Sequence, residues 1–275
     1  MTYYISFYLY VFICLIFKVE SFTPAGRYSH SSVLVGNKLY FFGGVLQDGF
    51  CSNEVFYLDV TQPFNIQVPS WNDLTPNSGM PFKGCWGTVS LLSDINNEQT
   101  IYLFGGITDD IATNNDKFVS MIYSFNLNSL KWNIPTVKGM QPERRRQVNS
   151  VIDNTGKMYI FGGGADSLIG SATTKTFNEM VIFNTVELSW SISTSPIISS
   201  RAGHTATILS NGVIVYIGGF SNEPTSQILD ISQITLYDTK SLTWSNKVCC
   251  MNVSIKKINE LIKLISYAYY RWQNL

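Results

Sequence analysis

The segment Met158-Tyr159-Ile160-Phe161-Gly162-Gly163 decides the fold, because its pattern occurs four times along the chain. Each copy is a short β-branched and aromatic run, which favours a buried strand over a helix. Each run ends in two glycines, which allow a positive φ and the close approach of another backbone. The glycine pairs begin at residues 43, 105, 162 and 218, so the spacing is 62, 57 and 56 residues, and this regularity indicates a repeat architecture. The other copies are Leu39-Tyr40-Phe41-Phe42-Gly43-Gly44, Ile101-Tyr102-Leu103-Phe104-Gly105-Gly106 and Val215-Tyr216-Ile217-Gly218-Gly219.

Three further features recur in register with the glycine pairs. A tryptophan follows the second glycine by 25 to 27 residues, as Trp71, Trp132, Trp190 and Trp244. In three repeats an aromatic residue and its polar neighbour stand seven residues before this tryptophan, as Phe125-Asn126, Phe183-Asn184 and Tyr237-Asp238. Before each glycine pair we identify a basic residue with a polar or aromatic residue three positions later: Arg27 with His30, Lys83 with Trp86, Arg146 with Asn149, and Arg201 with His204.

This combination resembles the kelch-repeat family, whose motif joins an Arg-x-x-His-like start, a strand ending in Gly-Gly, a Tyr-Asp-like pair and a later tryptophan. Four copies cover residues 24–247. The resemblance implies an all-β chain that forms a kelch-type β-propeller, similar in fold to the central domain of galactose oxidase. It implies four recognisable blades of four antiparallel strands, with the glycine pairs and tryptophans in structural roles. Because about five to seven blades usually close such a ring, we expect an incomplete or open ring.

The chain divides into three parts by its sequence pattern. Residues 1–21 contain an apolar run typical of a secretory signal peptide, with a retained signal anchor as the alternative. Residues 22–247 hold the four repeats. Residues 248–275 lack kelch features, and apolar residues at helical spacing from Ile255 to Ile265, with lysines between them, predict an amphipathic helix over 253–272. This tail either covers the open side of blade 4 or is foreign to the fold, through a truncated gene model or alternative splicing.

The cysteines fit a secreted protein. Cys51 lies in the loop that follows the glycine pair of blade 1, and Cys85 lies in the connection that enters blade 2. In an up-and-down blade these two connections fall on the same side of a propeller, so we predict a Cys51–Cys85 disulfide, with two free thiols as the alternative. Adjacent Cys249 and Cys250 are not expected to pair with each other, and the one glycosylation sequon starts at Asn252.

The composition and motifs argue against several functions. With 19 basic and 19 acidic side chains, the chain lacks the basic excess of a nucleic-acid surface. The basic run Arg144-Arg145-Arg146 is interpreted as repeat arginines in a solvated turn, in preference to an anion site. Both histidines, His30 and His204, occupy repeat positions, which leaves no independent pair for the copper of a galactose-oxidase-like enzyme. We therefore expect no enzyme activity, no cofactor and no metal site.

The favoured function is a protein-interaction scaffold, because rigid blades present variable loops. A carbohydrate-binding propeller is the alternative, with Phe50 and Trp86 as candidate contacts, although Trp86 is better placed for packing between blades. We expect protein partners, no nucleic acid, and a secreted location, or membrane anchoring through the leader or a further C-terminal segment. Candidates by location alone are the acidic residues Asp48, Asp109, Asp110, Asp166 and Glu223, in the loops Val45–Asn53, Ile107–Lys117, Gly164–Asn178 and Phe220–Gln233.

Overall fold

The computed structural model describes residues 22–63, 67, 69–93, 99–194, 199–223 and 225–248. Within these ranges the chain forms four four-stranded antiparallel sheets, and its helices are the single turns α2 (Thr75–Ser78) and η1 (Ser167–Ile169). The prediction of an all-β propeller with four blades is therefore confirmed. The expected leader, the expected helix over 253–272, Cys249, Cys250 and Asn252 lie outside the described residues.

In every blade, each strand pairs antiparallel with the next strand of the same sheet along the chain, from the innermost strand to the outermost. Blade 1 consists of β1 (Ser31–Val35), β2 (Lys38–Phe42), β3 (Val55–Asp59) and β4 (Trp71–Asp73). Blade 2 consists of β6 (Thr88–Ser93), β7 (Gln99–Phe104), β9 (Ile122–Asn126) and β10 (Lys131–Asn133). Blade 3 consists of β11 (Asn149–Ile152), β12 (Lys157–Phe161), β15 (Glu179–Asn184) and β16 (Ser189–Thr194). Blade 4 consists of β17 (Thr205–Ile208), β18 (Val213–Ile217), β21 (Gln233–Asp238) and β22 (Thr243–Val248).

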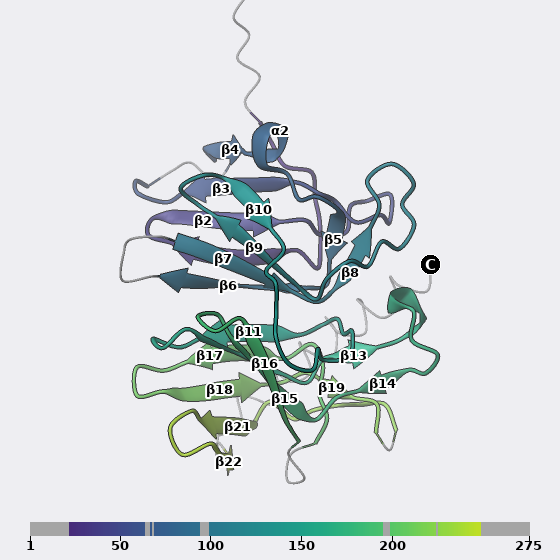
Figure 1. Cartoon of the computed structure of the whole chain (residues 1–275), viewed down its shortest axis with the longest axis vertical. Helices are drawn as coiled ribbons and strands as arrows, with labels where there is room; N and C mark the ends of the chain where they lie inside the picture. The colour runs from purple at the N-terminus through teal and green to yellow at the C-terminus, as the bar shows by residue number, and fades with distance from the viewer. Residues whose placement is uncertain are drawn as a thin grey trace, which may run out of the picture.

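The blades follow one another around a common axis, with the innermost strands in contact as β1–β6, β6–β11 and β11–β17. Figure 1 shows β3 and β4 at one end of the long axis and β21 and β22 at the other. No backbone hydrogen bond among the described residues joins blade 1 to blade 4. Blades 1 and 4 are thus the first and last blades of the array within the described residues.

The hydrophobic core lies between adjacent blades, in three clusters that bury the apolar faces of neighbouring sheets. A repeated contact organises each cluster: the phenylalanine before a glycine pair packs on the tryptophan of the next blade. The ring centroids are 5.9 Å apart for Phe42 and Trp132, and 5.7 Å apart for Phe104 and Trp190. They are 4.5 Å apart for Phe161 and Trp244. Because one sheet cannot bury both faces alone, this stacking supplies most of the burial on which the fold depends.

The structure corrects the register of the basic motif in blades 2 and 3. The second glycine of each pair donates its N–H to the next blade, and the accepting carbonyls belong to Gly84, Arg145 and Arg201. The residue equivalent to Arg27 is therefore Gly84 in blade 2 and Arg145 in blade 3, not Lys83 and Arg146. The positions of Trp86 and Asn149 shift accordingly, so that Gly87 and Val148 are the residues equivalent to His30.

The conserved role of the repeat arginine explains this register in physical terms. Arg27 donates to the carbonyl of Gly43, at 3.0 Å, and forms an ion pair with Glu54. Arg145 repeats both contacts with Gly162, at 3.0 Å, and Glu179. Blade 2 has lost both partners together, since Gly84 replaces the arginine and Met121 replaces the glutamate. In blade 4, Arg201 donates instead to the Thr235 hydroxyl at 3.0 Å.

Candidate interaction face

One side of the propeller collects the longest loops of all four blades. These loops join the second and third strands of each blade, and the chain segments that enter the blades run beside them, as shown by the bridges Tyr28–Val45, Ser52–Gly84, Arg146–Gly164 and Ala202–Phe220. We call this side the loop face, and define its loops as residues 43–54, 105–121, 162–178 and 218–232. Small ladders extend it: β5 (Lys83–Cys85) with β8 (Ile107–Asp109), β13 (Gly164–Ala165) with β14 (Lys175–Thr176), and β19 (Phe220–Ser221) with β20 (Gln227–Ile228). Figure 1 shows β5, β8, β13 and β14 together on this side.

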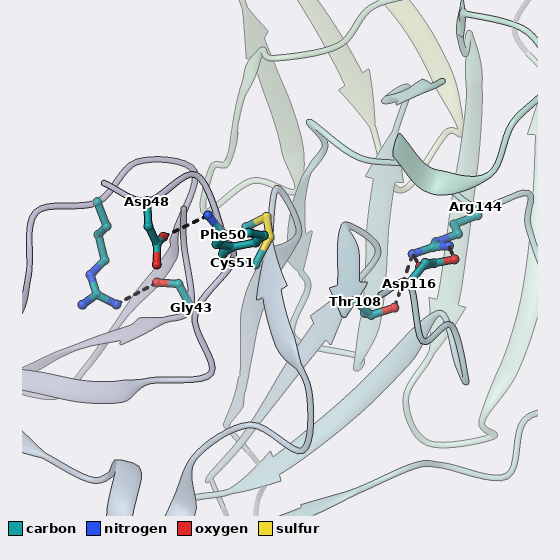
Figure 2. Close-up of a disulfide and its surroundings, with 9 residues drawn as sticks. Gly43, Asp48, Phe50, Cys51, Thr108, Asp116 and Arg144 are labelled. Carbon is teal, nitrogen blue, oxygen red and sulfur yellow. Dashed lines mark hydrogen bonds and ion pairs between the residues drawn. A yellow bond between two sulfur atoms is a disulfide. The ribbon is translucent and has the colours of Figure 1, made fainter. Parts of the chain in front are cut away.

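A disulfide fixes the loop of blade 1 to the segment that enters blade 2. The structure joins Cys51 to Cys85, with their Cα atoms 5.5 Å apart, the pairing that the sequence analysis predicts. Both cysteines are buried in a small cluster with Val45, packed by Tyr28 and Trp86. Figure 2 shows this disulfide between the Asp48 loop on one side and the Arg144–Asp116 pair on the other. The cross-link makes the two segments one rigid part of the loop face.

A row of side-chain contacts crosses three blades on this face. The Tyr28 and Trp86 rings meet edge to face, with centroids 6.0 Å apart and an interplanar angle of 81°. The Arg146 guanidinium lies over the Trp86 ring, 5.1 Å from its centroid. Arg146 also donates from Nε to both carboxylate oxygens of Asp166, at 3.1 Å each. Trp86 therefore packs across blades, as expected, and the sequence analysis did not identify Tyr28 as its partner.

All three arginines of the run 144–146 bind carboxylates. Arg144 forms a two-pronged contact with Asp116, at 2.8 and 2.6 Å, and also donates to the Thr108 hydroxyl at 3.3 Å. Arg145 pairs with Glu179, and Arg146 pairs with Asp166. The run is not the solvated turn expected from the sequence, because Arg145 and Arg146 are buried and each of the three charges has a carboxylate partner.

The acidic loop residues named from the sequence also have mostly local roles. Asp48 accepts a hydrogen bond from the backbone N–H of Phe50 at 3.0 Å. The side chain of Lys117 and the backbone N–H groups of Ala112 and Thr113 bind Asp110, and these contacts lower its pKa to about 2. Asp109 behaves differently, because burial raises its pKa. For Glu223 the structure shows backbone contacts with Ser221, so it remains a candidate by location.

Exposed apolar side chains are the most distinctive feature of the loop face. Every one of its four loops presents at least one of them to solvent, although large hydrophobic residues are usually buried. The exposed fraction of Phe50 is 47%, and that of Leu168 is 58%. The full set is Phe50, Ile111, Phe118, Val119, Leu168 and Ile228. Ten other exposed large hydrophobic side chains lie outside these loops in the described residues, so the property specific to this face is that each of its loops carries at least one.

The described residues contain no group of three His, Cys, Asp or Glu side chains that could hold a metal ion. The two histidines lie in blades 1 and 4, at opposite ends of the array. His204 is buried, which lowers its pKa to about 3 and keeps it neutral, whereas His30 is exposed. Within the described ranges, neither of the single-turn helices has the length and apolar character needed to span a bilayer.

Comparison with known proteins agrees with this architecture. Residues 29–258 match the KLHDC2/KLHL20/DRC7 Kelch-repeats domain family. The chain belongs to this kelch-repeat family. It is 27% identical over 236 residues to Kelch domain-containing protein 3 of Rattus norvegicus, which covers 79% of this chain and 56% of that protein. It is 28% identical over 162 residues to Kelch domain-containing protein 2 of Bos taurus, covering 58% of this chain and 36% of that protein.

The chain is also similar to a host cell factor. Host cell factor 2 of Homo sapiens is 26% identical over 214 residues, which cover 71% of this chain and 24% of that protein. The kelch chain thus spans about half, or less, of the length of the curated relatives that it matches. A kelch β-propeller fits a protein-interaction scaffold, because it places variable loops on a rigid frame.

Proposed function

We propose that this kelch propeller is a non-catalytic scaffold that binds a protein partner on its loop face. The observation that supports the proposal is the set of exposed apolar side chains on all four loops, from Phe50 to Ile228. The backbone beneath them is fixed by the Cys51–Cys85 disulfide and by the Arg144 and Arg146 ion pairs. A preorganised apolar surface binds a partner at a lower entropic cost than a mobile one.

A protein partner suits this surface better than a carbohydrate. Four of the six exposed apolar side chains are aliphatic, and Phe118 already packs against the Arg144 guanidinium, 4.7 Å from its ring centroid. Aliphatic groups pack well in the dry centre of a protein interface, whereas a sugar needs flat aromatic surfaces surrounded by hydrogen-bonding groups. The carbohydrate-binding alternative becomes one of the outcomes of the test.

We further propose that the chain enters the secretory pathway through its N-terminal leader, with membrane anchoring through the leader as the alternative. The Cys51–Cys85 disulfide supports this location, because such bonds persist in oxidising compartments. N-terminal sequencing of protein recovered from the medium of secretory cells is expected to begin near Phe22. Protein recovered from the cytosol with its N-terminus intact, and with Cys51 and Cys85 as alkylatable thiols, would contradict the proposal.

The binding proposal is tested by comparing proteins captured by the intact chain and by surface variants. Phe50→Asp and Leu168→Asp place charges on two different loops of the loop face. Leu242→Asp is the matched control, because Leu242 is 62% exposed but lies in the turn between the outer strands of blade 4. We expect the two loop variants to lose captured proteins that the control retains. Equal capture by all three variants, or retention on immobilised glycans instead of proteins, would overturn the proposal.

A further inference from the structure

The basic side chains of the loop face already have partners or are buried. They belong to its four loops and to the segments that enter the blades, residues 24–30, 81–87, 141–148 and 199–204. Lys83 donates to the side-chain oxygen of Asn114, and Arg201 is buried with a hydrogen bond to Thr235. The others form ion pairs with carboxylates: Arg27, Lys117, Arg144, Arg145, Arg146 and Lys175. Among the described residues, these segments thus present no exposed cation that lacks a partner.

Several carboxylates of the same segments are in no ion pair within the part of the chain that the structure describes. Asp109 is one of them. It lies opposite Asp116 across a β-bridge, and burial, followed by the charge of Asp116, raises its pKa. The exposed ones are Asp48, Glu223 and Asp230. The charges that these loops leave without compensation are therefore negative.

The two exposed aspartates are held in place by the backbone of their own loops. Asp230 accepts a hydrogen bond from the backbone N–H of Ser232 at 2.9 Å, and this bond lowers its pKa. Asp48 accepts the equivalent hydrogen bond from the backbone N–H of Phe50 at 3.0 Å. Because a carboxylate has two oxygens with room for several donors, each aspartate can still bind an external cation.

An exposed apolar side chain accompanies each of these aspartates in its loop. Phe50 stands two residues after Asp48, and Ile228 stands two residues before Asp230. The loops of blades 1 and 4 therefore both combine a free carboxylate with an exposed apolar group. A segment that matches these loops carries basic and apolar side chains together, because interfaces join an apolar centre to complementary charges.

The opposite side of the propeller lacks this bias toward one sign of charge. It consists of the turns between the first and second strands and between the third and fourth strands of each blade. Charged groups of both signs stand in or beside these turns, and within the described ranges none of them forms an ion pair. The lysines are Lys38, Lys131, Lys157 and Lys240, and the carboxylates are Asp59, Asp153, Glu187 and Asp238.

We propose that the loop face binds a cationic segment of its protein partner, in which lysine or arginine side chains alternate with apolar ones. This inference rests on the proposed binding function and specifies the chemistry of the partner. The apolar side chains of the segment pack on Phe50 and Ile228, and its cations pair with Asp48, Glu223 and Asp230. Complementary charges of this kind speed association and exclude partners of the wrong sign.

The sign of the free charge selects this partner over others. An acidic protein segment would bring its carboxylates against those of the loop face, where no exposed cation of the described segments is free to compensate them. The same repulsion acts on the phosphates of nucleic acids and of anionic lipid head groups. Further blades beside these four would add loops of their own but would not change the charge that these four loops carry.

The test selects peptides from a random library displayed on phage, with the purified full chain as bait. A variant with Phe50→Ser, Leu168→Ser and Ile228→Ser identifies the peptides that depend on the loop face, without a change of charge. We expect the peptides that the wild type retains and this variant loses to be enriched in lysine, arginine and apolar residues over the unselected library.

The affinity of one such peptide then tests the carboxylates. We expect the double variant Asp48→Asn/Asp230→Asn to bind it about fivefold more weakly at low salt, and the difference to shrink at high salt. The matched control is Asp59→Asn/Asp238→Asn on the opposite side, because these aspartates also accept hydrogen bonds from the backbone N–H two residues later. Asparagine keeps that acceptor in all four positions, and the control is expected to bind like the wild type.

The outcomes separate this inference from the binding proposal beneath it. Peptides that depend on the loop face but are neutral or acidic would overturn the cationic partner and leave the binding function standing. If no retained peptide depends on the loop face, both proposals fall. Equal affinities of the two double variants would also overturn the pairing with Asp48 and Asp230. If a variant fails to fold, the wild type alone gives the answer, because binding that does not weaken as salt rises contradicts a cationic segment.

Discussion

His204 and His30 hold the same position in their blades, one residue after the left-handed residues Gly203 and Ser29, but only His204 is buried. His204 is 1% exposed between blades 3 and 4, where its ring packs against Phe161 and Tyr216. In the described part of the chain no other blade lies against His30, and it is exposed. The same repeat position is thus a core residue or a surface residue, according to whether a neighbouring blade is present.

The buried histidine makes stability dependent on pH. Burial, followed by the charge of Arg201, lowers the pKa of His204 to about 3, against 6.5 as the ordinary value. The unfolded chain therefore binds a proton that the folded chain excludes, so stability is complete above about pH 6.5 and falls as the pH drops toward 3. We expect urea unfolding to show a loss of about 2 kcal/mol between pH 7 and pH 5 that His204→Asn removes.

The control for this pH effect is His30→Asn. Partial burial and the charge of Arg27 also lower the pKa of His30, but its side chain is exposed, so its replacement is expected to change the pH dependence much less than His204→Asn does. If the two variants show the same pH slope, the assignment of the effect to His204 is wrong.

The disulfide between Cys51 and Cys85 is expected to stabilise the folded chain. Cys51 and Cys85 are 34 residues apart, and a cross-link that closes a loop of this length stabilises a protein by about 3 to 4 kcal/mol on the chain-entropy account. We expect the double variant Cys51→Ser/Cys85→Ser to lose stability of this order in urea unfolding. Peptide mapping without reductant is expected to yield one linked peptide that contains both cysteines. Recovery of both cysteines as alkylated thiols from the purified protein would contradict the assignment.

The repeat arginine of blade 3 depends on its carboxylate partner. The Arg145 side chain is fully buried, and Glu179 supplies the negative charge that compensates it. Glu179→Ala leaves a buried cation unpaired, so we expect a loss of about 3 to 5 kcal/mol in the free energy of unfolding. Lys117→Ala is the control, because Lys117 pairs with Asp110 at the surface, where removal costs at most about 1 kcal/mol. Similar losses for the two variants would mean that Arg145 is hydrated.

The sequence predicts the blades well, because each blade repeats the same local pattern. The β-branched and aromatic runs of the second strands, the glycine pairs and the four tryptophans predict the number of blades and their order. The glycine pairs can be recognised from the local sequence, without information about the neighbouring blade. The cysteine pairing follows from the same pattern, since the up-and-down order of strands places both connections on one side.

The register of the basic motif could not be read in the same way. Arg145 and Arg146 are adjacent, and both stand at acceptable distances from Gly162. What separates them is a contact with Glu179, which lies 34 residues after Arg145. A glutamate at the start of the third strand, directly before β3 as Glu54 and first in β15 as Glu179, is the sequence signal that was missed. The Tyr28–Trp86–Arg146 row had no such signal, because its members come from three different blades.

The claim that supports all others is that each glycine pair is the joint at which the next blade passes. Gly162 and Gly218 test it in a matched comparison, because both have a φ of 69° and differ mainly in what lies beside them. The measurement is urea unfolding of Gly162→Ala and Gly218→Ala.

Both variants carry the strain of alanine at positive φ, about 1 to 2 kcal/mol. Gly162→Ala also forces a Cβ atom against the Arg201 carbonyl, so we expect it to lose about 2 kcal/mol more than Gly218→Ala. Equal losses at the two sites would contradict the account of the glycine pairs as joints between blades.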